Sequence, residues 1–256
     1  MNKKDLVSIT DELIHTFKFA GETALQLRKQ GLKINNKDDN TPVSNGDMSV
    51  NEILTTKIEK LTPGVPIVSE ESSSNKSVEN LKNFWLIDPI DGTYDYINNR
   101  NEFTINAALI IKQKPVWGMI NAPALDRLFF TLGPEANEIR GKQFIKLTCE
   151  KKSKQNEVKA VAYSENLKPD IIELHKKYGV TEYKKMKSSL KFCVIAAGEF
   201  DFYVAEPRAS EWDIAAGHAI LEHAGGIITD FENNKILYGK KDFKNPGLIL
   251  RRSTNL

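Results

Sequence analysis

The sequence predicts a layered αβ fold, and three observations lead to this fold class. Apolar residues recur at three- and four-residue steps near the N-terminus and again in the last third of the chain, as in amphipathic helices. Continuous runs of β-branched and aromatic residues lie between these helical patterns. A length of 256 residues allows one large domain or two small ones, and both halves contain helices and strands.

Two helices are predicted at the start of the chain. Apolar residues between positions 6 and 27 form one stripe, which Gly31 ends, and a second stripe at residues 48–61 is closed by a Thr-Pro-Gly sequence at residues 62–64. The polar stretch at residues 35–42, between the two helices, is predicted to be a loop.

Strands dominate the middle of the chain. Short strands are predicted at residues 65–68 and 84–87, and acidic residues follow each of them. Longer β-rich runs at residues 103–111, 116–120 and 128–131 are separated by Lys-Pro and Ala-Pro sequences, as in an antiparallel meander. A sheet with antiparallel neighbouring strands is therefore expected in the first half.

A lysine-rich segment at residues 146–159 stands at the midpoint and is the predicted boundary between two halves, residues 1–148 and 149–256. Helix and strand patterns alternate beyond this boundary. The predicted elements of the second half are helices at residues 165–178, 188–197 and 212–224 and strands at residues 200–204 and 227–229.

Composition excludes several classes of protein. Lys and Arg number 36 and Asp and Glu 34, so the formal net charge of +2 gives no reason to expect a nucleic-acid or membrane binder. Cys149 and Cys193 lie far apart, without the spacing of a disulfide framework or a zinc site, as in a reducing compartment. No signal peptide or integral membrane segment is recognised, so a cytoplasmic protein is expected.

The informative acidic residues stand at the ends of predicted elements rather than on helix faces. Taken singly, each has a structural interpretation, because a carboxylate can cap a turn or interact favourably with a helix dipole. These residues are Asp47 near the start of the second helix, Glu70 and Glu71 after one strand, Asp88 and Asp91 after the next, and Asp213 just inside a later helix.

The block Asp88-Pro-Ile-Asp-Gly-Thr93 carries a stronger signal. Proline shapes a tight turn that holds two carboxylates on one side, and Gly92 permits close approach of the backbone. If a helix starts here, its free N–H groups suit a phosphate. Carboxylates and a carbonyl oxygen are ligands for Mg²⁺, whereas the scattered histidines make zinc a poor alternative.

Three motifs together resemble the inositol monophosphatase superfamily of Mg²⁺-dependent, lithium-sensitive phosphatases. They are the Glu70-Glu71 pair, the Asp88–Thr93 block and the sequence Trp212-Asp-Ile-Ala-Ala-Gly217. The resemblance covers roughly residues 5–230. It implies a mixed α+β fold, namely the layered αβαβα sandwich of the inositol monophosphatase and fructose-1,6-bisphosphatase type.

The same resemblance implies a role for each residue of the motifs. Thr93 and Asp47 would form a relay that takes a proton from a metal-activated water, and the amides of Gly92 and Thr93 would hold the phosphate. Glu71 is assigned to supporting Glu70 or to capping a helix. Two or three Mg²⁺ ions, with Li⁺ as an inhibitor, would be held by Glu70, Asp88, the backbone carbonyl of Ile90, Asp91 and Asp213, with Asp91 bridging two ions.

The chemistry supports direct attack by water. Phosphate monoesters hydrolyse extremely slowly without catalysis, and two cations can activate the attacking water and stabilise the leaving oxygen. No better protein nucleophile is found, because neither cysteine has a base nearby in sequence and no Gly-x-Ser-x-Gly elbow occurs. A phosphoenzyme is therefore not expected.

Within the superfamily, four stretches look like the bacterial 3'(2'),5'-bisphosphate nucleotidases. They are residues 37–43, the Glu-Phe-Thr-x-Asn-x-Ala-Leu-Ile sequence at residues 102–110, and residues 188–193 and 212–219. Such enzymes remove the 3'-phosphate of adenosine 3',5'-bisphosphate, giving AMP and phosphate, and so clear a by-product of sulfate assimilation. Departures at residues 44–46 and 94–96 adjoin the site and bear on substrate preference.

A nucleotide with two phosphates needs additional cationic contacts. Lys191, beside Ser188 and Ser189, is the first candidate for the distal phosphate or ribose, and Arg208 is the second. A solvated surface position is the alternative for both cations. Asp213 is also expected to contact the substrate, and His218 is expected to pack on its helix. Phe192 and Tyr203 are expected either to stack on adenine or to fill the core.

Two alternatives to the nucleotidase hypothesis stay open. The first is an inositol-1-phosphate or sugar-phosphate phosphatase on the same fold. The second is a non-catalytic metal- or nucleotide-binding regulator, for which the loss of a metal ligand would be the expected sign, and none is missing. The resemblance also implies a homodimer, and it leaves peripheral association with the inner membrane open.

Overall fold

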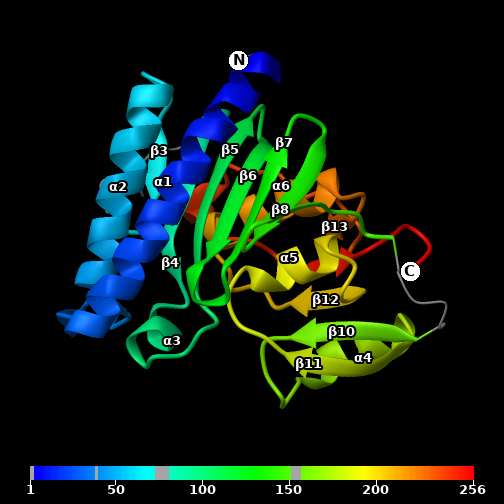
Figure 1. Ribbon diagram of the computed structural model, residues 1–256. Helices are drawn as coiled ribbons and strands as arrows, with labels where there is room; N and C mark the ends of the chain where they lie inside the picture. Colours follow the sequence, from blue (N-terminus) through cyan, green and yellow to red (C-terminus); the bar gives the residue numbers. More distant parts are fainter. Residues whose placement is uncertain (1–2, 38–39, 73–80, 151–156) are drawn as a thin grey trace.

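Two long helices form one of the two outer layers of the molecule. The computed structural model describes residues 3–37, 40–72, 81–150 and 157–256. Helices α1 (Lys3–Gln30) and α2 (Asn45–Leu61) lie side by side on one face of a large sheet (Figure 1). Leu13, Phe17 and Ala20 of α1 are completely buried at the three- and four-residue spacing that predicts this helix, so both N-terminal helix predictions are confirmed.

The segment between the two helices differs from the loop prediction at both ends. β1 (Ile34–Asn36) and β2 (Pro42–Ser44) pair antiparallel as a short hairpin. All three residues of β1 are exposed, so the strand has no alternation of apolar and polar residues from which it could be predicted. Asp38 and Asp39 lie outside the described residues.

The first large sheet contains the predicted meander. In the described part of the chain it has seven strands in the order β3-β4-β5-β6-β7-β8-β9, with β3 and β4 parallel and every later pair antiparallel. The strands are β3 (Ile67–Ser69), β4 (Asn83–Asp91), β5 (Thr104–Ile111), β6 (Lys114–Ala122), β7 (Arg127–Leu132), β8 (Glu135–Arg140) and β9 (Gln143–Lys146), with the 3₁₀ turn η2 (Pro123–Leu125) between β6 and β7.

Strand β4 runs farther than the sequence predicts. Its pairing with β5 shifts register between Asp88 and Asp91, so both carboxylates lie within the irregular end of the strand rather than in a turn after it. The short helix α3 (Thr93–Ile97) begins directly after this strand, with Gly92 as its N-cap residue. This irregularity in the strand therefore takes the place of the predicted tight turn. It carries the two carboxylates, Asp88 and Asp91, at the same end of β4.

The second large sheet brings together the carboxyl ends of three parallel strands. Its order is β11-β10-β12-β14-β13, and β10 is parallel to both β11 and β12. The three helices predicted for this half are confirmed, two of them with shorter bounds, whereas β10, β11 and β14 were not predicted. The elements are β10 (Val158–Ala162), α4 (Pro169–Lys177), β11 (Val180–Lys185), α5 (Leu190–Ala196), β12 (Phe202–Ala205), α6 (Glu211–His223), β13 (Ile227–Thr229), the 3₁₀ turn η3 (Lys241–Phe243) and β14 (Leu248–Arg251).

Three hydrophobic cores separate five layers, which confirms the αβαβα sandwich. The first core packs α1 and α2 on the seven-stranded sheet, the second packs α5 and α6 between the two sheets, and the third packs α4 on the outer face of the second sheet (Figure 1). Trp85 and Ile87 face the first core, and Phe84 and Leu86 face the second. Because both faces of the sheet are covered, its strands appear as continuous apolar runs.

The central core draws on both sides of the predicted boundary. Phe84 and Phe129 from the first half are buried with Cys193 and Ile220 from the second. Close contact of α6 with the sheet depends on Gly118, because a Cβ atom there would lie 2.4 Å from the carbonyl oxygen of Ala216. Residues 151–156 of the lysine-rich segment lie outside the described residues. No helix among the described residues is long and apolar enough to cross a membrane.

Candidate active site

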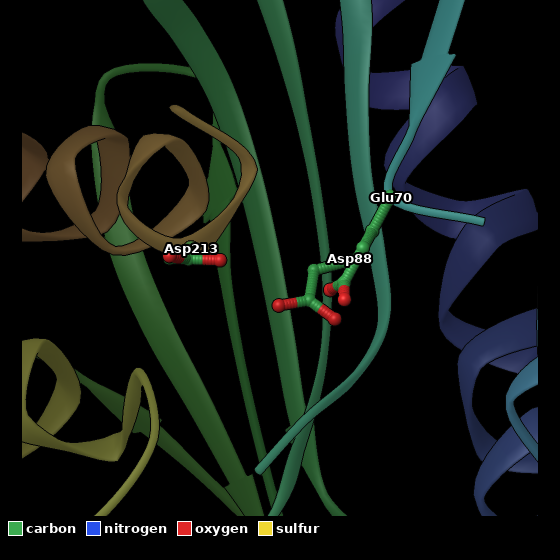
Figure 2. Close-up of side chains that lie close together, drawn as sticks. All are labelled: Glu70, Asp88 and Asp213. Carbon is green, nitrogen blue, oxygen red and sulfur yellow. The ribbon is translucent and has the colours of Figure 1, made fainter. Parts of the chain in front are cut away.

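Three carboxylates from three different elements meet between the two sheets. Glu70 follows β3, Asp88 lies in β4 and Asp213 lies in the first turn of α6 (Figure 2). One oxygen of each carboxylate lies within 4.8 Å of the others. The structure thus brings together three of the predicted metal ligands, although residues 70 and 213 are far apart in sequence.

Without a cation this cluster is electrostatically unfavourable. Burial and the neighbouring charges of Glu70 and Asp91 raise the pKa of Asp88 well above its usual range. Burial and the charge of Asp91 likewise raise the pKa of Asp213 to about 8. Oδ1 of Asp88 is buried and has no hydrogen-bond partner among the described residues. A bound cation would satisfy this oxygen and reverse both shifts, so the cluster fits a cation.

The donor set favours a hard divalent ion. The cluster offers carboxylate oxygens alone, without a histidine or cysteine among its three members. Mg²⁺ is held by one or two carboxylates together with substrate phosphate and water, whereas protein zinc sites are rich in histidine and cysteine. Glu70, Asp88 and Asp213 therefore fit Mg²⁺.

Asp91 lies beside this cluster and is held from the second half of the chain. Its Oδ2 accepts a hydrogen bond of 2.6 Å from the hydroxyl of Ser189, which itself accepts one of 2.7 Å from Nδ2 of Asn106. The Ser189 oxygen also lies 3.0 Å from the carbonyl oxygen of Asp213. Ser189, predicted as a substrate contact, is buried and oriented toward Asp91, so the structure favours a positioning role for its hydroxyl.

Thr93 and Asp47 face each other across the site. Oγ1 of Thr93 lies 3.0 Å from Oδ1 of Asp47 and 3.0 Å from the carbonyl oxygen of Ile90. The other oxygen of Asp47 accepts hydrogen bonds from the backbone N–H and the hydroxyl of Ser44, and the first of these bonds belongs to the capping box of α2. Asp47 is therefore a buried carboxylate that caps a helix on one side and meets a hydroxyl on the other.

Gly92 occupies a backbone conformation that favours glycine. Its φ is +92°, in the left-handed region, and a Cβ atom there would lie 3.2 Å from the carbonyl oxygen of Glu102. It joins the end of β4 to α3, so the two carboxylates of the strand and the hydroxyl of Thr93 come within one short segment.

Lys37 is a site residue that sequence reasoning did not identify. Its ammonium group donates to Oε1 of Glu70 at 2.8 Å and to Oε1 of Glu71 at 2.7 Å. Burial raises the pKa of Glu71, and the ammonium group of Lys37 opposes that shift. Glu71 thus shares a cation with Glu70, which is a supporting contact. A lone lysine in a polar loop gives no sequence signal of this contact.

A cavity of about 360 Å³ opens beside the carboxylates. Asp91, Asp213 and Lys191 line it, together with residues that follow the carboxyl ends of the three parallel strands β10, β11 and β12. Ligands in αβ proteins commonly bind at this edge of a sheet. The residues that follow these strands in the cavity wall are Tyr163, Lys187, Ser188, Ser189, Glu206, Arg208 and Ala209.

The predicted substrate contacts fall into different environments. Lys191 is buried, its ammonium group donates to the carbonyl oxygen of Ser188 and lies 5.4 Å from the ring centroid of Tyr203, and burial lowers its pKa to about 8. Phe192 and Tyr203 also line the cavity but are almost fully buried. Arg208 is exposed in the turn before α6.

His218 belongs to the core rather than to the cavity. Its Nδ1 lies 2.9 Å from the hydroxyl of Tyr238, and its Nε2 lies 3.2 Å from a carboxylate oxygen of Glu222. Tyr94, one of the departures at residues 94–96, is exposed and lies under the guanidinium group of Arg100, 5.5 Å from ring centroid to Cζ.

Comparison with known proteins identifies the family of this site. The sequence model of the Inositol monophosphatase family matches residues 5–254, almost the whole chain. The chain belongs to the inositol monophosphatase family. It is 31% identical to the 3'(2'),5'-bisphosphate nucleotidase CysQ of Aggregatibacter actinomycetemcomitans, over 94% of this chain and 92% of that protein. It is 30% identical to CysQ of Escherichia coli K12, over 93% and 97% of the two chains.

Solved structures share the fold of this inositol monophosphatase family member. CysQ of Bacteroides thetaiotaomicron superimposes with a TM-score of 0.80 at 27% identity, covering 96% of this chain and 97% of that one. The IMPase of Thermotoga maritima gives a TM-score of 0.75 at 23% identity, covering 95% and 91%. The family and its CysQ relatives make the chain a phosphatase, and the acidic cluster fits the metal-dependent catalysis that they imply.

Proposed function

We propose that this phosphatase removes the 3'-phosphate of adenosine 3',5'-bisphosphate, giving AMP and inorganic phosphate, with Mg²⁺ as cofactor. The observation that carries the proposal is the acidic cluster of Glu70, Asp88 and Asp213, which adjoins a cavity that also contains lysine and arginine side chains. The anionic substrate needs both features. The two CysQ relatives, whose names specify bisphosphate nucleotidases, support the choice of substrate.

The metal ligands of the proposal are Glu70, Asp88, the backbone carbonyl of Ile90, Asp91 and Asp213. When bound, Mg²⁺ would neutralise the charge on the phosphate and activate the attacking water. Two or three ions would be held by these residues, and Li⁺ is expected to inhibit. The orphaned oxygen of Asp88 supports the assignment, because a buried carboxylate oxygen without a partner costs free energy.

The proton route of the proposal uses Thr93 and Asp47. An ionised Asp47 accepts the hydroxyl proton of Thr93, and the hydroxyl oxygen in turn accepts a proton from the attacking water. The separation of 3.0 Å between Thr93 Oγ1 and Asp47 Oδ1 is a hydrogen-bond distance that supports the first transfer. Ser44 holds the other oxygen of Asp47, so the carboxylate keeps its orientation while the proton moves.

The remaining assignments concern the substrate. The amides of Gly92 and Thr93 would hold the phosphate that is hydrolysed, and Lys191 at the buried side of the cavity would contribute positive charge. Because Ser189 of the second half holds Asp91 of the first, we propose that residues 1–148 and 149–256 act as one catalytic unit.

A panel of substrates tests the proposed function. Phosphate release from adenosine 3',5'-bisphosphate is compared with release from inositol 1-phosphate at matched concentration, with and without Mg²⁺. The proposal expects a higher kcat/KM for the bisphosphate and no activity after removal of divalent ions. A preference for inositol 1-phosphate would contradict the proposal and would indicate that this protein is an inositol-phosphate or sugar-phosphate phosphatase.

A further inference from the structure

The cavity contains one cation whose charge has no evident use in the fold. Among the described residues, the guanidinium group of Arg208 forms no hydrogen bond or ion pair, and its contact is with the ring of Tyr163, 4.4 Å from Cζ to the ring centroid. Arg208 lies in an exposed turn, so folding does not require the side chain to line the cavity. An arginine in this setting is available to a ligand.

The other cations of the cavity are already engaged. Lys187 Nζ donates to the carbonyl oxygen of Tyr163 at 3.0 Å, and the buried Lys191 donates to the carbonyl oxygen of Ser188. Each of these ammonium groups therefore holds a backbone carbonyl of the cavity wall. Arg208 differs from both, because binding of an anion to its guanidinium group would break no such bond.

The nearby carboxylates are compensated as well. Glu206 pairs with Lys168 at 3.1 Å and accepts a hydrogen bond of 3.2 Å from the hydroxyl of Tyr163. Asp95 pairs with Arg100 at 2.9 Å. An anion that enters the cavity near Arg208 therefore meets an uncompensated positive charge. Glu206 and Asp95 have cationic partners of their own, and the two other carboxylates of the wall, Asp91 and Asp213, belong to the proposed metal site.

The position of Arg208 follows from the sheet. Tyr163 follows β10 and Arg208 follows β12, and these two strands are parallel neighbours, with Val161 opposite Tyr203. Their carboxyl ends lie at one edge, so the tyrosine ring lies against the guanidinium group. A stacked arginine loses little freedom on binding and presents two parallel N–H groups to phosphate. The same cavity is lined by Asp91 and Asp213.

We infer that Arg208, supported by Tyr163, binds the second phosphate of the substrate, the one that is not hydrolysed. The inference rests on the proposed function and deepens it, because it makes Arg208 the residue that distinguishes a nucleoside bisphosphate from a nucleoside monophosphate. Tyr163 is a positioning residue that acts through Arg208.

Arg208→Met tests the inference with two substrates and one product. kcat/KM is measured for adenosine 3',5'-bisphosphate and for adenosine 3'-monophosphate, which lacks the second phosphate. The variant should lose about 10- to 100-fold on the bisphosphate, as expected for one charge-assisted phosphate contact, and stay within about threefold on the monophosphate. Inhibition by AMP, which keeps the 5'-phosphate, should weaken by a similar factor.

Three variants separate a binding role from a structural one. Arg208→Lys should recover part of the preference, because it keeps the charge but loses the planar contact. Tyr163→Phe should keep most of the preference for the bisphosphate over the monophosphate, since Phe retains the ring. Tyr163→Leu should lose this preference. Arg140→Met is the matched control, because this arginine is already paired with Glu138 and Glu199 and lies outside the cavity wall.

The outcomes distinguish this inference from the function on which it rests. If the wild-type enzyme prefers the bisphosphate and Arg208→Met keeps that preference, or loses activity equally on both substrates, the role of Arg208 is refuted and the nucleotidase function stands. If the wild-type enzyme shows no preference for the bisphosphate, the proposed function fails and the inference fails with it.

Discussion

The two sides of Asp47 provide a test of the proton route. Thr93→Val removes the hydroxyl that meets Oδ1 of Asp47 while keeping the shape of the side chain. Ser44→Ala removes a hydroxyl from the opposite side, where it donates to Oδ2 at 2.6 Å and caps α2. The two variants thus take one hydrogen bond each from the same carboxylate, and only Thr93 lies on the proposed proton route.

The structure predicts similar losses of stability but different losses of activity. Asp47 is 1% exposed, so water does not replace either bond. Thr93→Val should cost about 1.5–3 kcal/mol of unfolding free energy, as for a hydrogen bond to a charged group. Ser44→Ala should cost about 0.5–2 kcal/mol, as for the loss of an N-cap. kcat should fall about 10²- to 10⁴-fold in Thr93→Val and less than about fivefold in Ser44→Ala.

The pH profile adds a second measurement. Burial raises the pKa of Asp47, and the hydrogen bonds from Ser44 and Thr93 lower it. Losing the Ser44 hydroxyl therefore raises this pKa further. Because Asp47 must be ionised to accept a proton, the acid limb of the kcat profile in Ser44→Ala should move to higher pH while its plateau is kept. Phosphate release at saturating Mg²⁺ measures the losses of kcat, and chemical unfolding measures the losses of stability. Equal losses of kcat in Thr93→Val and Ser44→Ala would refute the relay.

Three further predictions concern the cation and the backbone. The pKa of Asp213 is raised to about 8 without metal, so the metal-free protein should lose stability as pH rises from about 4 to about 8. The gain in Tm on adding Mg²⁺ should therefore be larger at about pH 8 than at about pH 5. Asp213→Asn should reduce this difference between the two pH values. Lys37→Met removes a cation that competes with Mg²⁺ for Glu70, so the Mg²⁺ affinity measured by calorimetry should rise about fivefold. The surface variant Lys57→Met is the control and should keep the wild-type Mg²⁺ affinity. Weaker Mg²⁺ binding by Lys37→Met would contradict the competition. Gly92→Ala and Gly64→Ala both place a side chain at positive φ, and each should cost about 1–3 kcal/mol in chemical unfolding, but only the former should lower kcat, by about tenfold or more.

Elements with a buried face could be predicted from the sequence. The stripes of α1 and α2 and the apolar runs of β5 and β6 follow from which residues must leave water. Strands β10 and β14 were not predicted although three residues of each are buried, because runs this short show no clear period. Strands β1 and β11 lack such a face and were not predicted either. β1 is exposed throughout, and five of the six residues of β11 are exposed, so their positions depend on backbone pairing with neighbours and not on the burial of side chains.

The acidic residues of the site could be found from motifs, but their supporting contacts could not. Residues 70, 88 and 213 belong to short recognisable sequences, and the fold brings them within 4.8 Å. Lys37 approaches Glu70 across 33 positions of sequence, and Ser189 approaches Asp91 across 98, so both contacts depend on tertiary packing. This is why the contact of Ser189 with Asp91 was not predicted, although Ser189 itself was expected in the site.

Binding of Mg²⁺ to the acidic cluster is the most direct test of the account. Mg²⁺ is titrated calorimetrically into the wild-type protein and Asp88→Asn, and phosphate release from adenosine 3',5'-bisphosphate is measured on the same samples. Asp88→Asn keeps the size of the side chain and removes the charge from the buried oxygen that lacks a partner. The account predicts that this variant, still folded by Tm, loses both Mg²⁺ binding and hydrolysis. Hydrolysis at the wild-type rate in Asp88→Asn would contradict the assignment of this cluster as the catalytic metal site.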